Sequence, residues 1–296
     1  MADSHARSLI STAQLQRGRG KLTYRIVLTA VIVIATLVFI GPLYFLFTDG
    51  LKSTQEAIAV PPTIIPHHLH PSSYVRAWNE FSLGQLLVNT LYYAFGALAF
   101  QLVFDVAAAY SLSRLRPVLG NVLFAMMLAT LMIPATVLIV PQYVTVSDLP
   151  ILHVNLIGSP AAIWLPSVAN AFNIFLLKRF FDSIPGELTA AAAIDGASPL
   201  RILWSVIIPI SRPILGVVSI FSLVAVWKDF LWPLLVEGGY QPTRETLNVG
   251  IWVASQTAPQ NLVLAASAMA AIPTVIFFLI FQRNILAGLT AGGLKG

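Results

Sequence analysis

The chain has 296 residues, of which 57% are hydrophobic and only 10% are charged, and its formal net charge is +5. Charged residues make up about 25% of a water-soluble domain, so this composition excludes a soluble globular protein and indicates one embedded in a lipid bilayer. The lack of cysteine excludes a disulfide scaffold, a thiolate metal site and a cysteine nucleophile.

The chain begins with a polar segment, 1–20, that is rich in Ser, Gln, Arg and Gly, and we expect it to form a mobile tail ahead of one membrane domain over 21–296. A basic stretch followed by an apolar run, 26–48, resembles a signal peptide. The run is longer than a signal core of about 7–15 residues, and no A-x-A-like site follows it, so a retained helix is the better interpretation.

Six windows are long and apolar enough to cross a hydrocarbon core of about 30 Å, which takes about 20 helical residues. The windows are 26–48, 86–108, 118–140, 161–177, 214–236 and 262–281. They predict an all-α polytopic membrane fold with six transmembrane helices and both termini on the same side.

Lys and Arg are distributed unevenly among the segments that join these windows. One side would carry Arg7, Arg17, Arg19, Lys21, Arg25, Arg114, Arg116, Lys178, Arg179, Arg201, Arg212, Arg283 and Lys295. The opposite loops contain only Lys52, Arg76 and Arg244. By the positive-inside rule, both termini and the segment 183–213 face the cytoplasm. This asymmetry explains the net charge without a nucleic-acid partner, because no compact basic face interleaved with aromatic residues is present.

Five prolines lie inside or at the end of the predicted spans: Pro134, Pro141, Pro166, Pro233 and Pro273. Each removes a backbone donor and bends its helix. Lipid cannot satisfy the freed carbonyl groups, so such bends are favoured beside protein or a wet cavity. Proline is also common in membrane helices, but five together favour a moving pathway.

The segment 183–213 interrupts the apolar runs with a pattern typical of two short helices. Ser183 is the predicted cap of the first helix, Pro185 lies in its first turn, and Glu187 lies near the positive end of its dipole. The helix then contains four small residues that would let a partner's surface approach the backbone closely: Ala190, Ala191, Ala192 and Ala193.

A turn and a second helix follow in the same segment. Gly196 stands where a helix ends in a left-handed turn that glycine adopts at low cost. Ser198 and Pro199 repeat the cap and first turn of a helix, and Pro209 closes or kinks it. The pattern predicts helix, glycine turn, helix, in a loop shaped to be gripped by another protein.

The spacing Ala-Ala, three residues, Gly, nine residues, apolar-x-apolar-Pro resembles the EAA loop of ATP-binding-cassette importer permeases. Its elements here are Ala191, Ala192, Gly196, Val206, Ile208 and Pro209. The family's leading Glu is replaced by Ala190, and Glu187 lies one turn earlier. Three further segments resemble the carbohydrate, MalG-like branch of the family: Asn89-Thr90, 227–233 and 281–296. Within 227–233 the family usually has Asn where this chain has Lys228.

This resemblance implies the permease subunit of an importer that moves a sugar or oligosaccharide by alternating access. It implies a second, related permease chain, two cytoplasmic ATPase domains, an external sugar-binding protein, and a bacterial or archaeal plasma (inner) membrane. The residues implied to couple to the ATPase are Glu187, Ala190, Ala191, Ala192, Asp195, Gly196, Ser198 and Pro209. No G-x-x-x-x-G-K-[ST] loop occurs, so we expect ATP and Mg²⁺ in the partner, with no cofactor, metal or catalytic residue in this chain.

The predicted candidates for the substrate path are polar side chains in or near the spans, because sugar hydroxyls need hydrogen-bond partners. They are Asn89, Tyr143, Asn170 and Asn173, with Gln142 of the same type. Such side chains also join membrane helices to one another, and for each residue alone that role is favoured.

Two other classes of function stay open. An importer permease for another polar solute would keep the alanine-rich loop but lack the tail 288–296. A secondary carrier that needs no ATPase would place ionisable groups at mid-membrane depth, where this chain offers only Asp105 and the pair Lys228 and Asp229.

Three further features invite other interpretations. His67, His68 and His70 would suit a metal, but without a carboxylate or cysteine beside them in the sequence a solvated loop is favoured. Trp227 and Trp232 are predicted as anchors at headgroup depth in preference to platforms for a sugar ring. Lys228 and Asp229 would point about 100° apart on a helix, so we expect them to pair elsewhere or to reach water.

Overall fold

The structure is a computed structural model that describes residues 18–238 and 242–293. Within these ranges it is helical and contains no strand apart from one isolated bridge between Leu149 and Val154. The first half contains α2 (Gly18–Asp49), α3 (Thr54–Ala57), α4 (Ser72–Glu80), α5 (Leu83–Tyr110), the π-helix η1 (Ser111–Leu115), α6 (Gly120–Thr130), α7 (Ala135–Ser147) and α8 (Ala161–Trp164). The second half contains α9 (Ala171–Ser183), α10 (Gly186–Ile194), α11 (Pro199–Ile202), the π-helix η2 (Leu203–Ile207), α12 (Ile208–Ile210), α13 (Arg212–Lys228), α14 (Leu231–Val236), the 3₁₀ helix η3 (Pro242–Arg244), α15 (Leu247–Ser255) and α16 (Gln260–Gly293).

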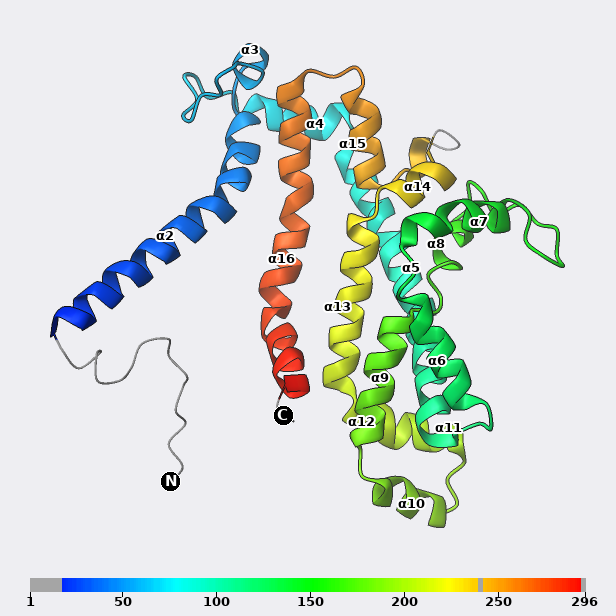
Figure 1. Ribbon diagram of the computed structural model, residues 1–296. Helices are drawn as coiled ribbons and strands as arrows, with labels where there is room; N and C mark the ends of the chain where they lie inside the picture. Colours follow the sequence, from blue (N-terminus) through cyan, green and yellow to red (C-terminus); the bar gives the residue numbers. More distant parts are fainter. Residues whose placement is uncertain (1–17, 239–241, 294–296) are drawn as a thin grey trace.

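The helices form an elongated bundle with two distinct ends (Figure 1). One end carries α10, together with the start of α2 and the last turns of α16; we name it the α10 end. The other, the α4 end, carries α3, α4 and the turn between α15 and α16. The all-α prediction is confirmed.

Three helices in the described ranges are long and apolar enough to cross a membrane: Leu22–Asp49, Leu83–Leu115 and Gln260–Ile280. Two bent pairs, α6 with α7 at 107° and α11–α12 with α13 at 83°, raise the number to five if each pair counts as one span. Helix α16 continues through Pro273 and past the predicted boundary at residue 281 to Gly293. The predicted tail residues 294–296 and the segment 1–17 lie outside the described residues.

Three of the predicted spans are therefore interrupted. The window 118–140 is broken between α6 and α7, the window 161–177 is divided between α8 and α9, and the window 214–236 is broken between α13 and α14. A proline lies at or near each break, namely Pro134, Pro166 and Pro233. Hydropathy reports apolarity alone, so these windows were wrong as continuous helices although the prolines indicated where they bend.

Helix α2 leans away from the rest of the bundle and meets it mainly through α16 (Figure 1). None of the residues in its most apolar window is buried inside the protein. At the α4 end α2 is fixed by Lys52, whose side chain is only 1% exposed and donates to Asp49 Oδ1 and to the Thr63 carbonyl oxygen, both at 2.5 Å. The bundle proper is built from α5, α9, α13 and α16.

The core consists of three apolar clusters. One joins α5, α9 and α13 to the base of the α10 segment, and includes Phe181, Ile207 and Val218. A second lies between α4, α5, α15 and α16, and a third packs Tyr93 of α5 against α7, α8 and α14. The first and third clusters position the two parts of the candidate site.

Candidate functional site

A cavity of about 260 Å³ lies where the three interrupted spans meet; we name it the central cavity. Its polar lining comes from α5, the first half of α7, the break between α8 and α9, the break after α13, and the start of α15. The polar side chains are Tyr93, Thr136, Gln142, Ser167, Asp229 and Thr246. Discontinuous membrane helices leave backbone polar groups and side chains free to hold a solute, so this junction is the best candidate for a solute path.

The helix breaks have local causes. Pro134 is the residue before α7, with ψ 130°, and it separates α7 from α6. Asp229 is extended (ψ 132°) and ends α13, so that its side chain reaches the central cavity. The hydroxyl of Thr246 is buried and has no hydrogen-bond partner among the described residues. A buried hydroxyl without a partner is available to a solute.

Asn170 and Asn173, predicted for the substrate path, lie at the start of α9. The side chain of Asn170 accepts a hydrogen bond from the backbone N–H of Asn173 at 3.0 Å and so caps the helix. Asp105 Oδ1 accepts from the backbone N–H of Asn170 at 2.9 Å, and Asn173 Nδ2 donates to Ser222 Oγ at 3.1 Å. These contacts join α9 to α5 and α13, and neither asparagine lines the central cavity.

Asn89 lies on α5 toward the α4 end, where its Nδ2 donates to the carbonyl oxygens of Thr243 at 2.8 Å and Glu245 at 3.0 Å. The next residue, Thr90, accepts a hydrogen bond from the backbone N–H of Leu247 at 2.8 Å. The pair thus fixes the segment between η3 and α15 to α5. Asn89 borders a second cavity, whereas the fourth candidate, Tyr143, packs against the apolar cluster around Tyr93.

The substrate role of these four residues stays a prediction. Sequence reasoning gave no role to Thr136, Ser167 and Thr246, which do line the central cavity. The prolines beside the breaks were the signal that could have found them.

The α10 segment forms the second part of the site and follows the predicted helix-turn-helix order. Gly196 has φ +79°, in the left-handed region, and Ser198 accepts a hydrogen bond from the backbone N–H of Arg201 at 3.4 Å as the cap of α11. The predicted cap at Ser183 was wrong, because α9 extends to that residue and its hydroxyl donates to the Phe180 carbonyl oxygen at 2.6 Å. Pro185 takes the cap position of α10 instead.

The surface of α10 is small and exposed. Glu187, Ala190, Ala191, Ala193 and Asp195 are exposed, and Ala192 is half-buried against the core below. Larger apolar side chains flank this surface, with Ile194 86% exposed and Trp204 68% exposed. Exposed apolar side chains of this kind occur at contacts with another protein or with lipid.

The base of the α10 segment is fixed to the bundle by buried contacts. Arg114 donates to the carbonyl oxygens of Phe181 at 2.5 Å and Ile184 at 2.6 Å, and the Tyr110 hydroxyl donates to the Pro199 carbonyl oxygen at 2.9 Å. Pro209 lies in the last turn before the predicted end of this helix, since α12 ends at Ile210 and the 83° bend into α13 follows. The α10 segment is thus joined to α13 through α11, η2 and α12.

Asp182, at the end of α9, joins this base. Burial raises its pKa, but hydrogen bonds from Lys178 and Ser113 outweigh burial and lower the pKa overall. The carboxylate accepts from Ser113 Oγ at 2.7 Å and from Lys178 Nζ at 2.8 Å. An ionised Asp182 therefore ties α9 to η1.

The remaining sequence interpretations have clear outcomes. Trp227 and Trp232 are 5% and 9% exposed, so both are buried in protein and the anchor prediction was wrong. A carboxylate does lie beside the histidines, because Glu56 Oε1 is 2.9 Å from His67 Nδ1, but the described residues contain no group of three metal-binding side chains.

Lys228 and Asp229 form no ion pair with each other. They border different cavities, Asp229 the central one and Lys228 another between α13 and α16.

Comparison with known proteins places this geometry in context. Residues 101–291 match the family described as "Binding-protein-dependent transport system inner membrane component". The chain is 28% identical over 266 residues to the sn-glycerol-3-phosphate transport system permease protein UgpE of Yersinia pestis bv. Antiqua (strain Antiqua), covering 87% of this chain and 93% of that protein. It is 30% identical, with the same coverage, to UgpE of Escherichia coli O1:K1 / APEC.

A solved structure has the same fold. A chain from the crystal structure of a bacterial ABC transporter involved in the import of the acidic polysaccharide alginate superposes with a TM-score of 0.76 at 24% sequence identity. The match covers 90% of this chain and 98% of the other.

Proposed function

This chain belongs to the family of binding-protein-dependent transport system inner membrane components, and on that premise we propose that it is the permease subunit of an ATP-driven importer for a sugar or a related polyol. The similarity to permeases named for sn-glycerol-3-phosphate and to a transporter named for alginate supports this solute class. The multi-pass helical fold is in keeping with a subunit that lies in the membrane.

The observation that carries the proposal is the α10 segment, which projects small, exposed side chains while its base is fixed to α5 and α9. Exposed Ala190 and Ala191 leave the backbone of α10 open to a partner's groove. The bend before α13 connects this helix to the break at Asp229, which borders the central cavity. A rigid shift of α10 is therefore expected to change the cavity's access.

The partners that we propose are those that the family implies. ATP and Mg²⁺ bind in two ATPase domains that grip α10, so the α10 end and both termini face the cytoplasm. A second permease chain completes the pathway, and an external binding protein delivers the solute to the α4 end. The chain itself supplies no catalytic residue and no cofactor.

The lack of cysteine makes this proposal directly testable. Ala191→Cys is combined with single cysteines in the ATPase groove. The matched control is His68→Cys, in the exposed loop at the α4 end. We expect crosslinks to the ATPase from position 191 only, and uptake of labelled sugar into proteoliposomes that requires ATP on the α10 side. Full transport by this chain without an ATPase, or a crosslink from position 68, would contradict the proposal.

A further inference from the structure

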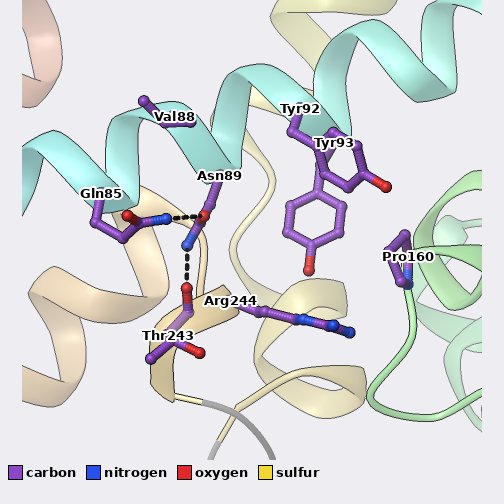
Figure 2. Close-up of a pocket in the computed structure, with 8 residues that line it drawn as sticks. All are labelled: Gln85, Val88, Asn89, Tyr92, Tyr93, Pro160, Thr243 and Arg244. Carbon is purple, nitrogen blue, oxygen red and sulfur yellow. Dashed lines mark hydrogen bonds between the residues drawn. The ribbon is translucent and has the colours of Figure 1, made fainter.

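A cavity of about 630 Å³ lies beside the first half of α5, toward the α4 end; we name it the outer pocket. Its walls come from α5, η3 and the residue before α8. They consist of Gln85, Val88, Asn89, Tyr92, Tyr93, Pro160, Thr243 and Arg244 (Figure 2). This volume lies within the range of about 300–1,000 Å³ that small-molecule sites occupy.

Among the described residues that form this wall, Arg244 alone has a charged side chain. It is exposed, and no hydrogen bond or ion pair joins it to another residue that the structure describes. In Figure 2 its side chain extends below the two tyrosine rings toward Pro160. A guanidinium group binds carboxylate or phosphate oxygens in pairs, so the pocket offers a site for an anionic group.

The other side chains in the wall suit hydroxyl groups and a sugar ring. Tyr92 is 53% exposed and presents an aromatic face, and Thr243 adds a hydroxyl. Gln85 Nε2 donates to Asn89 Oδ1 at 2.8 Å, which leaves the Gln85 amide oxygen as an acceptor. One cation, one aromatic face and several polar groups together fit an acidic polyol.

The backbone that carries Arg244 is held in place. Asn89 donates to the carbonyl oxygens on both sides of Arg244, those of Thr243 and Glu245, and Thr90 binds the N–H of Leu247 (Figure 2 shows the first of these contacts). A binding group on a fixed backbone loses little entropy when a ligand arrives. Asn89 and Thr90 are thus positioning residues for the arginine.

Glu237 interacts electrostatically with Arg244, but no ion pair joins the two side chains. Glu237 is completely buried, is absent from the wall of the outer pocket, and has no hydrogen-bond partner for either oxygen among the described residues. Burial raises the pKa of Glu237 to about 7, which weakens its negative charge near neutral pH. Arg244 therefore keeps its capacity for an anion from outside.

The outer pocket also adjoins the central cavity, because Tyr93 belongs to the walls of both. We propose that the outer pocket binds an acidic polyol, with Arg244 holding its carboxylate or phosphate group, before the solute passes Tyr93 into the central cavity. This inference rests on the proposed function and names the solute class more narrowly.

The test measures equilibrium binding to the assembled transporter in nanodiscs without ATP, by isothermal titration. The probes are glucose 6-phosphate, glucuronate and the neutral control glucose. For the wild type we expect about tenfold tighter binding of both acidic probes than of glucose, as charge-assisted hydrogen bonds imply. Arg244→Gln should remove that preference and leave glucose binding unchanged.

Three further variants sharpen the result. Arg76→Gln is the matched control, because Arg76 is exposed on α4 and pairs with Glu80 at 2.9 Å, away from the pocket. Tyr92→Ala should weaken all three probes alike, because it removes the ring face and not the charge. Arg244→Lys should retain more affinity for the phosphate probe than for the carboxylate probe, since a lysine acts as a point charge.

Equal binding of glucose and the acidic probes by the wild type would overturn the inference. It would also be overturned if Arg244→Gln and Arg76→Gln bound the three probes with the same affinities. A variant Arg244→Gln that lost only its association with the binding protein would show that Arg244 is a protein contact and would likewise overturn the inference. These outcomes are distinct from failure of the proposed function, which would appear as absent ATP-dependent uptake whatever the residue at position 244.

Discussion

The side-chain amide of Asn89 donates a hydrogen bond of 2.8 Å to the carbonyl oxygen of Thr243, which lies 154 residues further along the chain. The same nitrogen donates to Glu245, so one buried amide holds two carbonyl oxygens of the segment that follows α14. The Asn-Thr pair that resembles the carbohydrate branch of the family therefore has a structural reason in this chain: it fixes the loop that carries Arg244.

Asn89→Asp should release this loop. An aspartate keeps the oxygen that accepts from Gln85 but cannot donate, so the carbonyl oxygens of Thr243 and Glu245 lose their partner, at about 1–3 kcal/mol in stability. We expect a lower melting temperature and faster hydrogen exchange over residues 243–247. Asn155→Asp is the control, because the Asn155 oxygen only accepts, from the Ile157 N–H at 2.8 Å. Equal exchange in the two variants would rule out the anchoring role.

The parts of the structure that the sequence predicted well depend on local signals. The left-handed turn at Gly196 and the cap at Ser198 follow from residue types within a few positions of each other, and both are confirmed. The contacts of Asn89 were not predictable, since no local pattern reports a partner 154 residues away. Tyr93 likewise reads as one more apolar span residue, although it separates two cavities.

Hydropathy windows also limit what can be predicted about the helices, because they do not report where a helix bends. A window records whether a stretch is apolar and not whether its helix is straight, so 118–140 read as one span although α6 and α7 meet at 107°. Prolines mark possible breaks without deciding between them, as Pro134 separates two helices whereas α16 runs through Pro273. Packing against neighbouring helices decides which proline interrupts its helix.

Gly196→Val tests whether α10 acts as a lever. At φ +79° a β-branched residue is strained, by about 1–3 kcal/mol, although nothing lies within 4 Å of the new Cβ. We expect an assembled complex with weak uptake and weak stimulation of ATPase activity by the solute. Gly186→Val is the matched control, since that glycine also has open space but no positive φ. Normal coupling in Gly196→Val would refute the lever.

Gly96→Ala tests how tightly Trp164 packs against α5 beside Tyr93. A Cβ at position 96 would overlap the indole ring of Trp164, whose Nε1 donates to the Tyr93 carbonyl oxygen at 3.2 Å. The ring is rigid and contacts Phe100, with ring centroids 5.7 Å apart, so it cannot move aside freely. Overpacking should cost about 1–3 kcal/mol, measured as a lower melting temperature.

Gly41→Ala is the comparison for that variant, because nothing lies within 4 Å of its added methyl group. A melting temperature for Gly96→Ala as high as that of Gly41→Ala would mean that Trp164 adapts without cost.

Glu237 gives the protein a predicted pH dependence of stability. Burial raises its pKa from 4.5 to about 7, against an opposing effect of Arg244. Between these two values the folded protein binds a proton that the unfolded chain has lost, so stability is fully present below about pH 4.5 and declines as the pH rises toward 7. We expect the melting temperature of the purified complex to fall from pH 5 to pH 8, in part through this residue.

The variant Glu237→Gln carries no charge at either pH, so it should flatten this fall and melt at a higher temperature than the wild type at pH 8. The control Glu80→Gln, on the exposed face of α4, should keep the wild-type slope. Parallel slopes for the wild type and Glu237→Gln would show that the carboxyl group is ionised without cost in the folded protein.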